Sequence, residues 1–248
     1  KEANDMEELR RGGRTALDTV VAPRHAFESI RNEPKWYLAF LILITLFTIG
    51  YILQRPASEH ASLRSLRHML ATNAMLANLT DSQRSEILEK AQHHDSGSNI
   101  ARALMEIVGV AVALLLDALL LFAAVSVSHG SPRFSIAWAA SVNIGIATIG
   151  LSSLVLGAIA ALRGPDSFAA SIDLARAIPS LGMFLPGVTG GAAAFFTTLN
   201  VFVLWGLFLN AQALRWACNV RGSIVWIGPV AVTLLLALIS AWGASFAG

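Results

Sequence analysis

Five long stretches of apolar residues constrain this chain more than any other feature. They cover residues 36–53, 106–127, 134–162, 193–214 and 223–247. A helix crosses the bilayer core with about 20 apolar residues, and a spanning segment must satisfy its own backbone hydrogen bonds. The sequence therefore predicts an all-α, polytopic membrane protein whose residues 36–248 form a bundle of five transmembrane helices.

The composition narrows the class of function. With 55% hydrophobic and 14% charged residues, the chain is too apolar for an ordinary soluble domain. A net charge of +2 and the lack of a basic run with interleaved aromatics argue against nucleic-acid binding. Cys218, the single cysteine, excludes an internal disulfide or a cysteine-based metal cluster.

Signals of enzymatic chemistry are weak. The histidines lie outside the predicted spans, without metal-ligand spacing, at His25, His60, His68, His93, His94 and His129. The sequence has no nucleophile elbow, phosphate loop or intramembrane His–Glu motif. We therefore expect a protein that is not an enzyme and needs neither a metal nor a cofactor.

Residues 1–35 form a polar N-terminal segment with two short amphipathic patterns, at 14–21 and 23–31. Proline fits the first turn of a helix, and the residue before a proline is disfavoured in one. We expect two helices that lie on the membrane surface rather than ordinary soluble helices, because a span follows at once. The membrane-surface segment comprises Pro23, Phe27, Ile30, Pro34 and Trp36.

Residues 54–103 form the largest polar region, and apolar residues recur within it at helical spacing. Thr80 and Gln83 have the spacing of a capping box, which predicts a helix start. A turn-like stretch follows at 93–99. We expect a helical loop outside the bilayer.

Prolines and glycines interrupt the apolar residues ahead of the fourth span, at Pro179, Gly182, Pro186, Gly187, Gly190 and Gly191. Non-helical backbone at membrane depth requires shielding by protein or a cavity. Residues 178–192 are therefore expected to form a re-entrant or surface-lying segment. In span three, Ser153, Gly157 and Ala161 form a stripe of small residues that suits close helix contact.

The positions of basic residues predict the orientation. Those on the side of the N-terminus are Arg24, Arg31, Lys35, Arg133, Arg215 and Arg221. Cytoplasmic loops carry an excess of Lys and Arg, so the bias places the N-terminus in the cytoplasm and the C-terminus outside. Arginine outnumbers lysine, which is typical of a GC-rich bacterial genome and favours a bacterial inner membrane.

Asp117 is the one charged residue deep inside a predicted span. A carboxylate there is costly, so it should face the bundle interior and find a donor. Candidate partners in spans three and four are Asn143, Asn200, Asn210 and Gln212. We expect an intramembrane polar clasp between helices, and the alternative is a proton or cation site.

Three segments resemble bacterial members of the Yip (Ypt-interacting-protein) family of five-span membrane proteins. They are APRHAFESIRNEPKWYLAFLI (22–42), LTDSQRSEILEKAQ (79–92) and LNVFVLWGLFLNAQALRWAC (199–218). The proline often found midway along span three is absent, and Asn200 stands where Asp is common. The Asp-Leu-Tyr-Gly-Pro-type motif of eukaryotic members is also missing, so Rab-GTPase binding is not carried over. The resemblance implies a helical, non-enzymatic membrane protein, and some bacterial members are associated with ABC-type export systems.

These observations predict an accessory or assembly subunit that binds membrane lipids and another integral membrane complex. An ABC transporter or its adaptor is one candidate partner. The candidate partner interface is an aromatic ridge formed by Phe202, Trp205 and Phe208. The alternatives are a small transporter or channel that uses Asp117 with segment 178–192, and a lipid-organising protein that uses residues 14–31.

Overall fold

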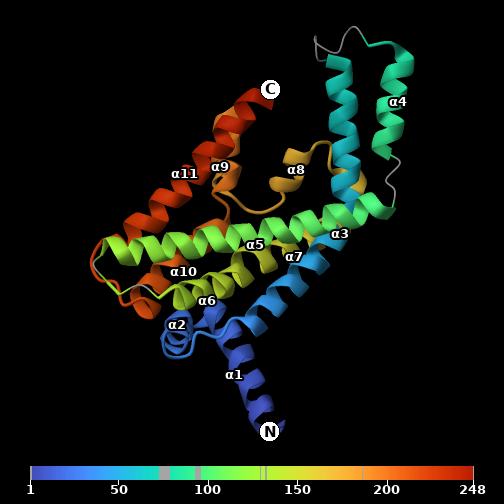
Figure 1. Cartoon of the computed structure of the whole chain (residues 1–248). Coiled ribbons are helices and arrows are strands. Elements are labelled where there is room, and N and C mark those ends of the chain that lie inside the picture. Colours follow the sequence, from blue (N-terminus) through green and yellow to red (C-terminus); the bar gives the residue numbers. More distant parts are fainter. Residues whose placement is uncertain are drawn as a thin grey trace.

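The computed structural model is built from helices (Figure 1). It describes residues 2–72, 79–92, 96–128, 130–131, 133–185 and 187–247. Within these residues there is no β-strand, and a single antiparallel bridge joins Ser180 to Asn200. The all-α prediction is confirmed.

Four helices in the described part of the chain are long and apolar enough to cross a membrane. They are α3 (Tyr37–Thr72), α5 (Ser96–Val127), the continuous helix α6–η2–α7 (Phe134–Gly145, Ile146–Leu151 and Ser152–Arg163), and α11 (Ile224–Ala247). Their apolar stretches are Tyr37–Ala71, Ala103–Val127, Phe134–Arg163 and Ile224–Ala244. By length and composition these helices indicate an integral membrane protein. The third predicted span agrees with its helix to within one residue.

The prediction of one continuous helix over 193–214 is wrong. Helix α9 (Gly190–Thr198) ends before Asn200, and α10 (Val201–Gln212) begins after it and continues as η5 (Ala213–Ala217). Asn200 Oδ1 accepts hydrogen bonds from the backbone N–H groups of Phe202 and Val203, at 3.0 and 3.1 Å. This N-cap starts a new helix inside an apolar run. The remaining helix, Val201–Ala217, is shorter than the four above, so five spans are not confirmed.

Segment 178–192 is paired with this break. The N–H of Leu181 donates to the carbonyl of Leu199 at 3.1 Å, and the N–H of Val201 donates to Pro179 at 3.0 Å. The segment contains one short helical turn, η4 (Leu181–Phe184), and residue 186 lies outside the described residues. The backbone N–H and C=O groups that lack helical partners in segment 178–192 and at the α9–α10 break therefore hydrogen-bond to each other.

The first span was predicted to end at residue 53, but α3 continues for almost twenty residues beyond it. Proline inside a helix is a common cause of a kink, and Pro56 lies inside α3. Figure 1 shows that α3 turns along its length, so that its second part rises beside α4 (Asp81–Gln92). The capping box at α4 is confirmed: the N–H of Thr80 donates to Gln83 Oε1 at 2.9 Å. Helix α5 already includes residues 96–99, where a turn was predicted, and the histidines at 93, 94 and 129 lie outside the described residues.

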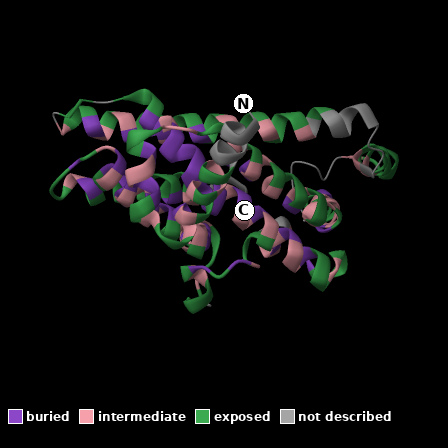
Figure 2. Ribbon diagram, turned by 90° about the horizontal axis from the view of Figure 1, so that it is seen from below, coloured by how far each residue is buried: buried purple, intermediate pink, exposed green. Residues whose placement is uncertain are grey.

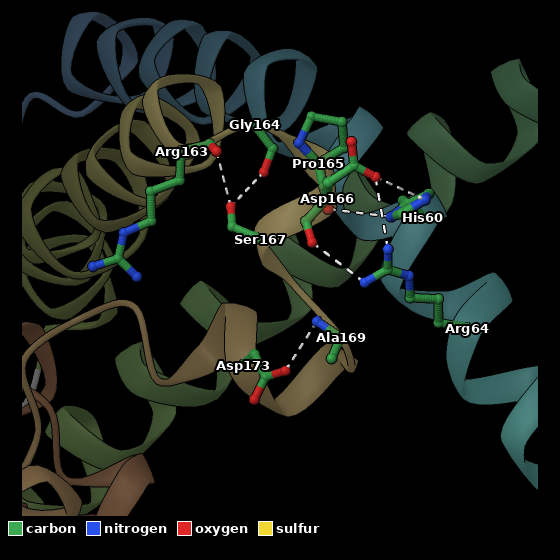
Figure 3. A network of polar contacts seen from close by, with 9 residues as sticks. All are labelled: His60, Arg64, Arg163, Gly164, Pro165, Asp166, Ser167, Ala169 and Asp173. Carbon is green, nitrogen blue, oxygen red and sulfur yellow. Dashed lines mark hydrogen bonds and ion pairs between the residues drawn. The ribbon is translucent and has the colours of Figure 1, made fainter.

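A polar network holds the second part of α3 against the turn that follows α7 (Figure 3). His60 Nδ1 lies 3.2 Å from the carbonyl of Pro165, and His60 Nε2 lies 3.4 Å from Asp166 Oδ1. Arg64 donates to the carbonyl of Asp166 at 3.3 Å and lies 3.7 Å from its carboxylate. Asp166 belongs to the turn η3 (Pro165–Ser167), directly after α7. This network therefore fixes the end of α7 relative to the second part of α3.

Helix α2 (Pro23–Asn32) buries in the protein the apolar face that was predicted to contact the membrane surface. Phe27 and Ile30, at 0% exposure, belong to the largest core cluster, together with residues of α5, α6 and α10. Trp36 packs edge-on against Trp138, with ring centroids 5.8 Å apart. Figure 2 shows the buried residues gathered where the helices cross. The apolar face of α2 is therefore used to pack against protein.

The two N-terminal helices differ in how far their apolar side chains are exposed. Pro23 is in the first turn of α2, as the sequence predicts, and Pro34 follows the end of that helix. In α1 (Glu2–Val21), Leu17 and Val21 are 63% and 69% exposed. Of the two N-terminal helices, α1 is therefore the one that exposes apolar side chains.

A candidate intramembrane binding site

A cavity of about 450 Å³ lies among α5, α6–η2, α10 and α11. Most of its lining is aliphatic. Its polar lining residues are Asp117, Ser141, Thr148, Asn210 and Thr233. A largely apolar cavity with a few convergent polar groups is the usual form of a ligand or partner site. We refer to it as the Asp117 cavity.

This cavity forms because α10 lies close to η2 on one side, while α11 diverges from α5 on the other (Figure 1). Gly206 of α10 lies against η2, because a Cβ there would come within 2.6 Å of Thr148 Cγ2. In contrast, α11 diverges from α5 along most of its length (Figure 1). Pro229 of α11 lines the cavity and removes one hydrogen bond of that helix.

Asp117 on α5, Ser141 on α6 and Asn210 on α10 line the cavity together. The Ser141 hydroxyl donates to the carbonyl of Leu114 at 2.7 Å, and Asn210 Nδ2 donates to the carbonyl of Gly206 at 3.1 Å. Asn210 keeps a second amide hydrogen for Asp117, whereas the single hydroxyl hydrogen of Ser141 is already used. Polar side chains of three helices therefore line the cavity together with the Asp117 carboxyl group, which is half-buried.

Of the predicted partners of Asp117, Asn210 is the one that lines the cavity with it. Buried Asn143 donates to the carbonyl of Ala139 at 2.8 Å, and its Oδ1 has no partner. Asn200 caps α10, and Gln212 Oε1 accepts from Trp216 Nε1 at 2.8 Å. Ser141 was missed because a single hydroxyl in an apolar helix is common and carries no distinguishing signal.

The predicted aromatic ridge is divided between two surroundings. Trp205 and Phe208 stack with ring centroids 5.0 Å apart, and Phe208 also packs against Trp226 of α11 at 6.3 Å. Phe202 and Trp205 line a separate apolar groove of about 340 Å³, beside Val20 of α1. Only part of the ridge is therefore open to a partner.

The broken segment lines a different cavity, of about 320 Å³, whose polar residues include Ser180, Thr189 and Thr197. None of its lining residues is shared with the Asp117 cavity. The transporter hypothesis combined Asp117 with segment 178–192 in one site. The structure places the two features in separate sites. Among the described residues, no group of three or more His, Cys, Asp or Glu side chains could hold a metal ion.

No protein-family model, characterised protein or solved structure matches this chain. The class that the fold defines is a helical integral membrane protein. The resemblance to Yip proteins remains a prediction.

Cys218 is a poor probe of orientation, although it is the single thiol. It is only partly exposed, in the loop after η5, and burial raises the pKa of its thiol to about 11. Because the thiolate is the reactive form, labelling at neutral pH should be about a hundredfold slower than for a free cysteine.

Cysteines introduced at exposed positions should report the orientation instead. In a Cys218→Ser background, Glu89→Cys on α4 should react with an impermeant maleimide in intact cells. Ser131→Cys, in the turn between α5 and α6, should react only after lysis if the N-terminus is cytoplasmic. The reverse pattern would contradict the predicted orientation.

Proposed function

We propose that this protein is a non-enzymatic accessory subunit of another integral membrane complex and that it binds its partner at the Asp117 cavity. The observation that carries this proposal is a carboxyl group that lines a mostly aliphatic cavity between long apolar helices. Ionisable groups at membrane depth are costly unless they are paired. A partner that supplies a donor or a cation therefore gains affinity and specificity at this position.

The cavity suits side chains of a partner helix. A helix is about 10–12 Å across, so about 450 Å³ holds several side chains but no complete helix. Leu120, Ile227 and Leu236 line the cavity and are 42%, 57% and 57% exposed. A partner helix would lie across this apolar rim and extend a Lys, Arg, Asn or Gln side chain towards Asp117. The resemblance to Yip proteins adds an ABC-type transporter or its adaptor as a candidate, in a bacterial cytoplasmic membrane.

Copurification of variants tests this proposal. The wild-type protein, purified in mild detergent, should co-elute with another membrane protein, and Asp117→Leu should lose at least about tenfold of that partner. Glu89→Gln is the matched control, because this residue is exposed on α4 and does not line the cavity. If the Asp117→Leu variant retained its partner at full yield, the cavity would not be the docking site. If no membrane protein co-eluted with the wild type, the accessory function itself would fail.

The stability of the same variants separates docking from folding. Asp117→Asn should keep the wild-type melting temperature, because an amide can accept from Asn210 and donate to the Ser141 oxygen. Asp117→Leu should lose roughly 1 kcal/mol for each interhelical hydrogen bond. Thermal unfolding in detergent measures both effects. Equal melting temperatures for the two variants would argue against the clasp.

A small cation transporter is the second candidate function. It is favoured by the position of Asp117, whose carboxyl group on α5 lines a cavity between helices. It predicts flux in liposomes that contain only this protein and loss of that flux in Asp117→Asn. The third hypothesis, lipid organisation through residues 14–31, loses support because Phe27 and Ile30 are buried in protein.

A further inference from the structure

A second pocket, of about 470 Å³, lies between η5 and the start of α11. Arg215, Trp216, Arg221 and Trp226 line it. The connecting loop bends back, since the N–H groups of Cys218 and Val220 donate to the carbonyls of Ala213 and Leu214 in η5, at 3.0 and 2.9 Å. Gly222 has φ of 84°, a conformation that favours glycine. The pocket therefore has a defined backbone wall.

Trp216 is held in place within this pocket. Its Nε1 donates to Gln212, while the guanidinium groups of Arg24 and Arg215 lie 4.3 and 5.1 Å from its ring centre. Trp226 is 44% exposed at the first turn of α11. Tryptophan side chains prefer the membrane–water interface, so the two indoles place the pocket at the level of the lipid headgroups.

Positive charge in the pocket is not neutralised. Within the described residues, Arg215 and Arg221 are exposed and form no ion pair. The carboxylates on the neighbouring α2 and the turn after it are engaged: Glu28 pairs with Arg24 at 3.0 Å, and Glu33 pairs with Lys35 at 3.1 Å. Two guanidinium groups without an ion pair thus lie in a pocket with aromatic walls and can bind an anion.

We infer that this pocket binds a phosphate group, and that its source is the headgroup of an anionic phospholipid. Guanidinium groups bind phosphate through paired, charge-assisted hydrogen bonds. The apolar surface of α11 begins at Ile224, immediately beside the pocket, and would accept the acyl chains. Basic pockets between transmembrane helices are known to bind anionic headgroups in this way. This inference does not depend on the proposed docking site at Asp117.

Native mass spectrometry of the detergent-purified full chain tests the inference. Phosphatidylglycerol and phosphatidylcholine with identical acyl chains are added separately, and bound lipid is counted. The wild type should prefer phosphatidylglycerol, and each arginine should contribute about fivefold. Arg215→Gln/Arg221→Gln should remove that preference. Arg163→Gln/Arg176→Gln is the matched control, because both arginines are exposed, form no ion pair among the described residues and do not line this pocket. Arg163 is the last residue of α7, and Arg176 follows it in the chain.

Soluble ligands distinguish the two sources of phosphate. Glycerol 3-phosphate or inorganic phosphate should compete weakly with the lipid, since neither contacts α11. Equal affinity for these soluble ligands would support the phosphate pocket but assign it to a soluble phosphate compound. Equal binding of the two lipids, or a preference that survives in Arg215→Gln/Arg221→Gln, would overturn the inference.

A second measurement covers the case in which the double variant does not fold. The wild-type preference for phosphatidylglycerol should fall as salt concentration rises, because exposed charges are screened. Arg215→Lys/Arg221→Lys should keep part of the preference, since the charge remains but the paired hydrogen bonds are lost. A preference that is independent of salt would contradict the inference.

Discussion

Gly157→Ala is expected to destabilise the bundle by about 1–3 kcal/mol or more, because one methyl group has no space at this position. A Cβ at Gly157 would lie 2.9 Å from the Cα of Gly50 and 3.0 Å from Leu53 Cβ. A Cβ at Gly50 would in turn lie 2.5 Å from the backbone N of Leu154. Helices α3 and α7 therefore touch through their backbones, and neither can yield as a flexible side chain would.

Thermal unfolding in detergent measures this effect, with Gly109→Ala in α5 as the control. A Cβ at Gly109 meets no atom within 4 Å, so this variant should equal the wild type or gain up to about 1 kcal/mol from the better helix former. Gly50→Ala should resemble Gly157→Ala, and the two should not add, because they disrupt the same contact. A Gly157→Ala protein that unfolds at the wild-type temperature would show that α3 and α7 do not touch in this way.

The small-residue stripe illustrates how far the sequence predicts packing. Ser153 and Gly157 do face another helix, and Ser153 Oγ donates to the carbonyl of Phe47 at 3.3 Å. Ala161, one turn further, is exposed. Spacing identifies a surface that allows close approach, but it specifies neither the partner helix nor where the contact ends, since α3 turns along its length (Figure 1).

The long apolar helices were predictable because hydrophobic length is a property of the sequence alone. The break at Asn200 was not. An asparagine inside an apolar run is compatible with a continuous helix, and its role as an N-cap depends on backbone partners supplied by Pro179 and Leu181. Helix α5 begins ten residues before the predicted span 106–127, because polar residues can extend a helix beyond its apolar stretch.

The candidate site was predictable only in part. Asp117 is conspicuous because a charge in an apolar span is costly, and Asn210 was among its candidate partners. The cavity itself depends on the divergence of α11 and on the contact between Gly206 and Thr148, neither of which has a local sequence signal. The arginines of the phosphate pocket were recognised only as indicators of orientation.

The second large effect on stability is expected in helix α2. Phe27→Ala should destabilise the protein by about 3–5 kcal/mol, the usual cost of removing a fully buried aromatic side chain. Phe27 is 0% exposed, and α2 packs against α6, α10 and η5. Loss of its ring would leave a void where three later elements of the chain meet.

Leu17→Ala in α1 is the matched control, because Leu17 is 63% exposed. This variant should unfold within about 0.5 kcal/mol of the wild type. A membrane-surface helix makes the opposite prediction for position 27: an aromatic side chain in lipid contributes to membrane binding and little to the stability of the bundle. Thermal unfolding of both variants in detergent decides between the two arrangements. If Phe27→Ala were as stable as Leu17→Ala, α2 would lie on the membrane surface after all, and the core built around it would be wrong.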